Sequence, residues 1–292
     1  FTIGQGFLVE PVTVQVNEGA AAKDVLEEVA KEKNLTINLS SYGYYIDSIS
    51  YADTGVINIP ESIQKMPSID VDYGYGNQHY DAPTNTSTNA LFTDDQKLGS
   101  GSYSSLAGWM YTVNNVAPDV AMDSQPVKDG DVIRLQFSVY GYGADLGYDT
   151  ESYTGIPKLQ MANRDALLKE VAETNEKKDY WMAYPNVKSA YDKAFQVAKE
   201  YNPTQKNVDN ALAALQGAKK KPTYPTVKTA SIKTVKNVRK YKAKIYVNQA
   251  SGATGYQYKY SVSKSFKKSV VKTTSKTYIT TKKLKKKQVC YV

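Results

Sequence analysis

The chain has 292 residues, of which 41% are hydrophobic and 23% charged, a composition typical of globular domains and a length that allows two or three of them. No apolar run approaches the roughly 18–20 residues that a membrane-spanning helix needs. Cys290 is the only cysteine and His79 the only histidine. This excludes an intrachain disulfide framework and a cysteine-rich zinc site, and it leaves few groups for nucleophilic catalysis.

Charge is unevenly distributed along the chain, although the net value is +8. Residues 1–150 carry 7 Lys/Arg and 20 Asp/Glu, a net charge of −13, while residues 151–218 carry 9 of each kind. Residues 219–292 carry 21 Lys/Arg and no acidic residue. Such sharp boundaries predict three domains with separate surfaces, the last of which could bind an anionic polymer through charge alone.

The first segment combines strand and helix patterns. Four strands are predicted, over residues 7–16, 44–50, 108–113 and 133–139. Residues 21–33 have apolar side chains at helical spacing and predict one amphipathic helix, whose start is weak because Ala21 cannot cap it. Asn114 and Asn115 predict the turn that follows the third strand.

Three motifs in this segment carry a resemblance to a known family. The sequences GWMYTVNN (108–115), DGDVI (129–133) and YGADLG (142–147) resemble the transcobalamin-like C-terminal domain found in secreted bacterial proteins. The resemblance implies an α+β, β-grasp-like domain over residues 1–150. Compared with the family pattern, residues 51–107 form a long insertion.

The middle segment, residues 158–218, has helical periodicity throughout. Asn163, Pro185 and Thr204 stand at the starts of three predicted helices, which short loops would join into an antiparallel three-helix bundle. The sequence NPTQKNVDNALAAL (202–215) resembles the FIVAR family of surface proteins. That resemblance implies a spacer or a weak glycan-binding module.

The last segment begins with a Pro/Lys-rich linker, residues 219–229, which predicts a semi-rigid extended chain. Residues 230–292 contain short runs rich in Tyr, Val, Ile and Thr that predict strands. The sequence GATGYQYKYSVSKSFKK (252–268) resembles the lysine-rich fibronectin type III modules of Gram-positive surface proteins, although Val247 stands where that family has its core Trp. The chain stops inside what would be the sixth strand, so we expect an incomplete all-β sandwich and a longer protein.

The candidate ligand surface lies in the insertion. Residues 72–89 (DYGYGNQHYDAPTNTSTN) are rich in tyrosine and turn formers, and long segments of this kind inside a domain are usually functional. Tyrosine rings present flat apolar faces that suit sugar rings, but these tyrosines could instead fold back as a plug beside Trp109. Trp109 and Tyr111 share one strand face, and either pack on the helix at 21–33 or line a ligand surface. The residues assigned to ligand contact are Tyr73, Tyr75, His79, Tyr80, Trp109, Tyr111 and Asn114.

We therefore expect a non-catalytic binding or adhesion protein of a Gram-positive-type bacterium, secreted or attached to the cell wall, that recognises a glycan or another cell-surface ligand. The start at Phe1 rather than Met fits removal of a signal peptide. Alternatives are a corrinoid (cobalamin) or other small-molecule binding protein, and a purely structural spacer. We expect no cofactor, no metal, no nucleic acid and no membrane span, and an anionic cell-wall polymer as a further partner of the basic segment.

Overall fold

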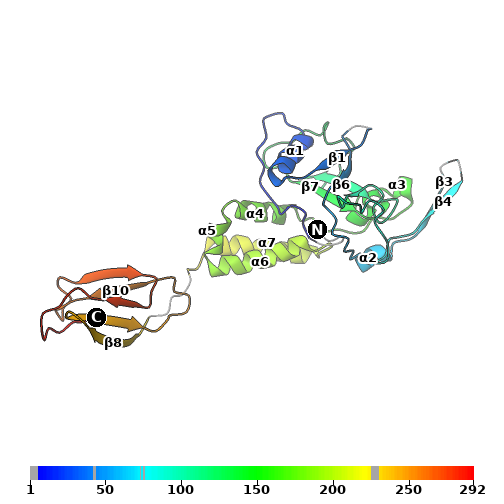
Figure 1. Ribbon diagram of the computed structural model, residues 1–292. Coiled ribbons are helices and arrows are strands. Elements are labelled where there is room, and N and C mark those ends of the chain that lie inside the picture. Colours follow the sequence, from blue (N-terminus) through cyan, green and yellow to red (C-terminus); the bar gives the residue numbers. More distant parts are fainter. Residues whose placement is uncertain (1–5, 42–43, 73, 75, 225–229) are drawn as a thin grey trace. The chain divides into compact units, whose positions relative to one another are not determined.

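The computed structural model describes residues 6–41, 44–72, 74, 76–224 and 230–292, and the chain divides into two compact units, Phe1–Thr223 and Tyr224–Val292 (Figure 1). The elements of the first unit are α1 (Ala22–Lys33), β1 (Ile37–Leu39), β2 (Ile46–Ile49), α2 (Glu61–Gln64), β3 (Ile69–Asp72), β4 (Asn77–Tyr80), β5 (Leu98–Gly99), β6 (Gly108–Val113), β7 (Ile133–Ser138), η1 (Gly141–Leu146), α3 (Glu151–Thr154), α4 (Asp165–Asn175), α5 (Lys178–Met182), α6 (Pro185–Lys199) and α7 (Gln205–Lys220). In the part of the chain that is described, no helix is long and apolar enough to cross a membrane.

The first half of this unit combines helices with small antiparallel sheets, ordered β1–β2–β5, β3–β4 and β6–β7. This confirms the mixed α+β class, while the finer β-grasp assignment stays a prediction. α1 forms where the helical spacing predicted it, and it buries Ala22 and Leu26. Ala21, the residue just before the helix, provides no side-chain cap. Instead, the Asp24 carboxylate accepts a hydrogen bond of 2.7 Å from the Ala21 N–H.

The strand predicted over residues 7–16 is wrong, because the described residues of this segment belong to no strand. Residues 7–11 of this segment instead contact the helices α4 and α6. The Phe7 ring contacts Phe195 of α6 edge-on, with 5.5 Å between ring centroids. The Asn175 side chain of α4 donates a hydrogen bond of 2.8 Å to the Pro11 carbonyl. These contacts compete with the sheet pairing that the alternating pattern favours.

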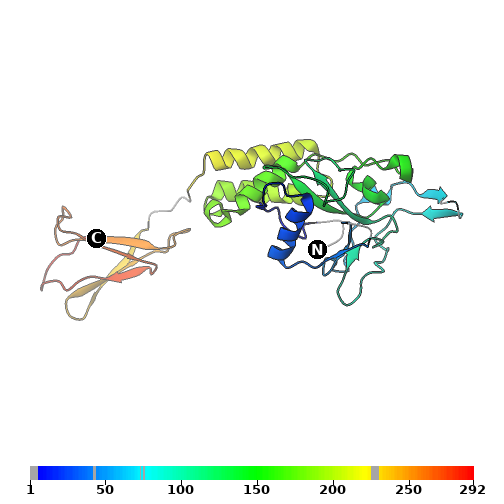
Figure 2. The same ribbon diagram turned by 90° about the horizontal axis from the view of Figure 1, so that it is seen from above.

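The first half of this unit has its own hydrophobic core, which we call the first core, and the insertion, residues 51–107, supplies much of it. Ile59, Ile63, Leu98 and Leu106 all expose 2% or less of their surface. Most of this segment is therefore part of the folded unit, and the β3–β4 hairpin is the part that projects from it (Figures 1 and 2).

β6 and β7 pair over six residues, from Gly108 opposite Ser138 to Val113 opposite Ile133. Asn114 and Asn115 both have positive φ, 51° and 64°, as the predicted turn requires. Cross-strand partners share a face, so one face of the pair is apolar and carries Trp109 beside Phe137.

All three predicted long helices of the middle segment are present, as α4, α6 and α7, and the short α5 precedes α6. The Asn163 side chain accepts a hydrogen bond of 3.0 Å from the Asp165 N–H at the start of α4. Pro185 opens α6, and the Thr204 hydroxyl accepts from the Asn207 N–H at 3.2 Å at the start of α7. Buried residues from the three helices form a second core, among them Leu167, Val171, Val187, Ala194, Val208 and Leu215.

The second unit contains two small antiparallel sheets, ordered β12–β9–β8 and β10–β11. Its strands are β8 (Ile232–Val238), β9 (Lys242–Val247), β10 (Tyr256–Tyr260), β11 (Val270–Thr274) and β12 (Tyr278–Thr280). Ile245, Tyr258 and Ile279 are central to its core, and Val247 packs against that core as a partly buried residue. Near the end of the chain, the strand-like run QVCYV (288–292) forms only a single bridge, between Tyr291 and Ser261.

Candidate functional site

The β3–β4 hairpin carries the predicted ligand residues of the insertion. Its register places Asp70 opposite His79, and Ile69 opposite Tyr80. The structure brings His79 between two carboxylates: its Nδ1 lies 2.8 Å from Asp70 Oδ1, and its Nε2 lies 3.1 Å from Asp81 Oδ1. Tyr73 and Tyr75, also predicted here, lie outside the described residues.

His79 is exposed, and its charge is set by these two neighbours. The hydrogen bond to Asp70 contributes most, followed by the bond to Asp81, and together they raise the pKa of His79 above its usual value. The imidazolium is therefore favoured at neutral pH more than in an isolated histidine. The hairpin thus presents one imidazole flanked by two carboxylates.

Tyr80 marks the boundary between the buried base of the hairpin and its exposed part. Its ring is half-buried and packs against the first core, while its hydroxyl donates to Gln78 Oε1 at 2.5 Å. The buried Tyr140 side chain holds the base by placing its hydroxyl 2.9 Å from the Pro67 carbonyl and 3.0 Å from the Tyr80 carbonyl. The base belongs to the core, whereas Gln78 and His79 face solvent.

Trp109 and Tyr111 are half-buried on the apolar face of β6 and pack against the first core, which includes Leu26 of α1. The Trp109 indole N–H donates to the Leu98 carbonyl at 2.8 Å, and its ring meets Phe137 edge-on at 5.3 Å. The Tyr111 hydroxyl donates to the Val120 carbonyl, and burial raises the pKa of Tyr111. The polar atoms of both side chains thus have partners within the chain.

Asn114 closes the end of the β6–β7 pair. Its side-chain Nδ2 donates to Asp131 at 2.8 Å, and its Oδ1 accepts from the Val132 N–H at 3.0 Å. The hydrogen bond from Asn114 is the main reason why the pKa of Asp131 lies below its usual value. The structure gives Asn114 a clear local role in the turn and does not bring it near the hairpin residues in any contact of the described chain.

A cavity of about 1450 Å³ lies beside β7. Its walls are mainly apolar, with Val25, Leu26 and Val29 from α1 and Leu135 and Phe137 from β7. Trp109 reaches this cavity too, whereas the residues of the hairpin do not line it. Of the predicted ligand residues, His79 and Tyr80 lie in the described part of the hairpin and Trp109 lines the cavity, whereas Tyr111 and Asn114 belong to neither place.

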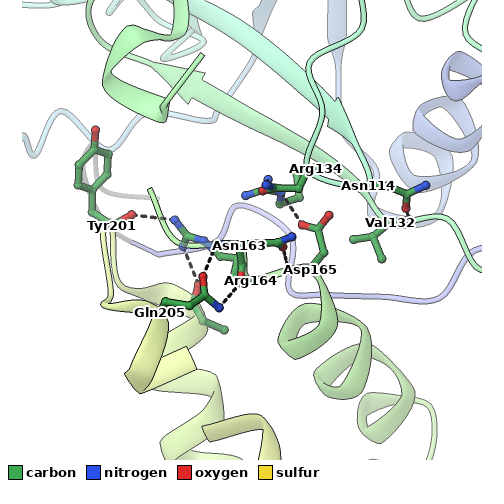
Figure 3. Close-up of polar contacts among 10 residues, drawn as sticks. Asn114, Val132, Arg134, Asn163, Arg164, Asp165, Tyr201 and Gln205 are labelled. Atoms are coloured by element: carbon green, nitrogen blue, oxygen red, sulfur yellow. Dashed lines mark hydrogen bonds and ion pairs between the residues drawn. The ribbon is translucent and has the colours of Figure 1, made fainter. Parts of the chain in front are cut away.

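Figure 3 shows a buried polar junction beside the cavity, where β7 meets the start of α4. Arg134 Nε lies 2.9 Å from Asp165 Oδ1, and the two side chains are only 12% and 11% exposed. The two groups are not aligned as a hydrogen bond, so the contact is an ion pair. Burial is the main cause that raises the pKa of Asp165, and the two arginines oppose it.

Arg164 binds the end of α6 at the same junction. Its guanidinium donates to the carbonyls of Ala198, Glu200 and Tyr201 at 3.2, 2.7 and 2.7 Å (Figure 3). A cation at a helix C-terminus satisfies free carbonyls and interacts favourably with the helix dipole. Burial lowers the pKa of Arg164 to about 10, which still keeps it charged at neutral pH.

This junction was not predicted from the sequence, although the composition holds a signal for it. The chain has three arginines, Arg134, Arg164 and Arg239, and its other basic residues are lysines. Arginine is preferred for buried ion pairs and for fork-like hydrogen bonding. Two of three arginines in a lysine-rich chain meet at one buried site.

Among the described residues, no group of three or more His, Cys, Asp or Glu side chains is placed to hold a metal ion.

The fold and these sites define a multidomain protein of mixed helix and sheet. A model of the family described as "Domain of unknown function (DUF4430)", a transcobalamin-like domain family, matches residues 94–139. The match covers β5, β6 and β7, and so includes the strand that lines the cavity. No curated protein and no solved structure matches the chain. The resemblances of the later segments to FIVAR and fibronectin type III modules remain predictions.

Proposed function

We propose that this chain is a non-catalytic, extracellular binding protein that recognises a glycan or another cell-surface ligand through the β3–β4 hairpin. The observation that carries the proposal is the hairpin itself, which projects from the first unit while Tyr140 holds its base in the core (Figure 2). An exposed segment on a fixed base pays little ordering entropy when it binds.

The chemistry of the hairpin suits a hydroxyl-rich ligand. Asn77, Gln78 and His79 are exposed on β4, with Asp70 opposite on β3, so donors and acceptors stand together along one short segment. Such side chains can pair with sugar hydroxyls, which both donate and accept. Tyr73 and Tyr75, at the turn between these strands in the sequence, would add apolar faces for the sugar ring.

The other segments fit the same proposal as accessories. In this view the helical segment is a FIVAR-like spacer, and the second unit is a fibronectin-like module whose lysines attract an anionic cell-wall polymer. Lys244 lies over the ring of Tyr278 at 4.0 Å and over that of Tyr246 at 5.1 Å, so one lysine and two tyrosines lie together there. The protein would be secreted or attached to the wall.

A glycan array tests the proposal with the full chain and two variants. Tyr73→Ser/Tyr75→Ser removes both predicted ring contacts, and Tyr180→Ser is the matched control, because Tyr180 is exposed on α5 in the helical segment. We expect at least a tenfold loss of glycan binding in the double variant and none in the control. Binding that survives the double substitution, or the lack of any glycan bound by the native chain, would contradict the proposal.

A second candidate is capture of a corrinoid or another small molecule, and the cavity beside β7 favours it. Ligand pockets usually measure about 300–1,000 Å³, so a cavity of about 1450 Å³ has room for a large ligand. Calorimetric titration with cobalamin separates the two candidates. A submicromolar Kd would favour the carrier, while the absence of heat would leave the hairpin proposal in place.

A further inference from the structure

β7 has one free edge, because in the described chain it pairs with β6 alone. The Asn114 N–H donates to the Val132 carbonyl at 2.9 Å, which sets the phase of the hydrogen bonds between the two strands. In an antiparallel pair, every second residue exchanges hydrogen bonds with its partner, and the residues between them point away from it. The N–H and C=O groups of Ile133, Leu135 and Phe137 are therefore directed away from β6, where no described backbone group bonds to them.

Residues 12–16 (VTVQV) are a second stretch of unpaired main chain, which we call the strap. Within the described part of the chain, its backbone groups make no hydrogen bond to another backbone group. Its burial nevertheless alternates, since Val12 and Val14 are half-buried whereas Thr13 and Gln15 are exposed. This is the period of a strand, and Val and Thr are residues that strands favour. The strap therefore has the burial pattern and the composition of a strand without a pairing partner.

The strap and the free edge meet at the same cavity. All five strap residues line this cavity of about 1450 Å³, and so do residues 133–137 of β7. Buried backbone N–H and C=O groups almost always find a hydrogen-bonding partner, so two unpaired stretches of main chain at one cavity are suited to pair with each other. Val25, Leu26 and Val29 of α1 also line the cavity, and they offer an apolar surface to the valines of the strap.

The strap is fixed at both ends, which keeps it beside the cavity. Before it, the Pro11 carbonyl accepts a hydrogen bond of 2.8 Å from Asn175 at the end of α4. After it, the Ala20 carbonyl accepts a hydrogen bond of 3.1 Å from the Val127 N–H. Five extended residues span about 17 Å, against about 20 Å for the six residues of β7. Because both ends are already held, pairing with β7 requires little further ordering of the chain.

We propose that the strap closes on β7 as an added strand and shuts the cavity. The open strap of this structure and the closed strap are two states of one segment, and both keep the same two anchors. In the closed state, the half-buried valines extend the apolar face that carries Leu135 and Phe137. The strap is the occupant of this edge because it is tethered at the cavity, whereas a separate peptide would lose its translational and rotational freedom on binding. A guest of the cavity then has to open the strap before it can enter.

Amide hydrogen exchange measured by NMR on the full chain tests this proposal. A variant with the strap replaced by Gly-Ser-Gly-Ser-Gly keeps both anchors but loses the alternating valines. The amides of Ile133, Leu135 and Phe137 should exchange at least tenfold more slowly in the native chain than in this variant. The amides of Arg134 and Gln136, which bond to β6, should exchange alike in the two chains. Equal rates in both chains for the first three amides, or equal acceleration of all five in the variant, overturns the proposal.

Three controls separate closure of the strap from other causes of protection. Thr13→Ser/Gln15→Asn keeps the valines and should keep the native exchange rates. The native protection should also persist on tenfold dilution, because the strap and the edge belong to one chain, and its loss would show pairing between copies and overturn the proposal. If the three edge amides of the native chain exchange as fast as unbonded amides, the edge is open and the proposal fails, even where the glycine-serine variant does not fold.

The effect of the strap on access to the cavity is measured with an apolar fluorescent dye, 1-anilinonaphthalene-8-sulfonate. The dye should bind the glycine-serine variant at least tenfold more tightly than it binds the native chain or Thr13→Ser/Gln15→Asn. Equal affinity for all three chains would contradict closure of the cavity by the strap.

Discussion

Replacement of Arg134 by methionine should destabilise the first unit far more than an exposed substitution would. Asp165 would remain buried, with neither carboxyl oxygen in a hydrogen bond and its ion-pair partner removed. Loss of one partner of a buried ion pair typically costs about 3–5 kcal/mol. Arg164 still contributes favourable charge at this site, so we expect the lower end, about 3 kcal/mol.

The double variant Arg134→Met/Asp165→Leu should be less destabilised than Arg134→Met alone, because it also removes the buried carboxyl group that has no hydrogen-bond partner. Replacing a whole buried pair by apolar groups is often neutral in free energy. The assay is urea denaturation followed by tryptophan fluorescence. The chain has two tryptophans, Trp109 packed against the first core and Trp181 packed against the second. Variants with either one replaced by phenylalanine therefore report on the two halves separately.

Two results would refute this reasoning. The first is a cost below about 1 kcal/mol for Arg134→Met, which would show that water or another group reaches Asp165. The second is additivity, in which the double variant loses as much as the two single variants together, since coupled residues in contact should deviate by 0.5–3 kcal/mol. Lys158→Met is the matched control, because the pair of Lys158 with Asp149 is more exposed and should be worth about 0–1 kcal/mol.

Three further predictions concern single side chains. Burial raises the pKa of Asp145 to about 7, so its contribution to stability should be complete below about pH 4 and lost as pH rises to about 7; urea titrations should find that dependence absent in Asp145→Asn. The pKa of His79, followed by NMR, should fall in Asp70→Asn, and a constant value would contradict the role given to that carboxylate. Tyr140→Phe removes a hydroxyl that bonds two carbonyls and should lower the free energy of unfolding by about 1–2 kcal/mol. Amide hydrogen exchange in the hairpin should become faster, and unchanged exchange would argue against the role of Tyr140 in holding its base.

The elements that sequence reasoning predicted well are those fixed by local patterns. The helices opened by Pro185 and Thr204 follow from caps and apolar spacing within one stretch of chain. The turn at Asn114 is equally local. The strand predicted over residues 7–16 failed, because alternation reports only what a segment could do in a sheet and not whether the helices hold it elsewhere.

The site was less accessible to sequence reasoning for a related reason. His79 was predicted as a ligand contact, but its partner Asp70 becomes a neighbour only through the strand register. Arg134 and Asp165 belong to different predicted domains, and their pairing depends on how those parts pack. The insertion was interpreted chiefly as a ligand-binding segment, because residues 72–89 at its centre are rich in tyrosine and turn formers. Its flanks, however, contain buried residues such as Ile63 and Leu98, which contribute to the core.

The hydrogen bonds of Tyr140 at the base of the hairpin keep the stability of this segment apart from the identity of its exposed residues. Tyr140 bonds to main-chain carbonyls rather than to side chains. These bonds therefore do not depend on which residues occupy the exposed positions of the hairpin. Sequence change at those positions is therefore uncoupled from the stability of the unit. In the proposed binding function, this arrangement would let the ligand change through mutations at the exposed hairpin positions alone, and it makes the hairpin a suitable position for a randomised library.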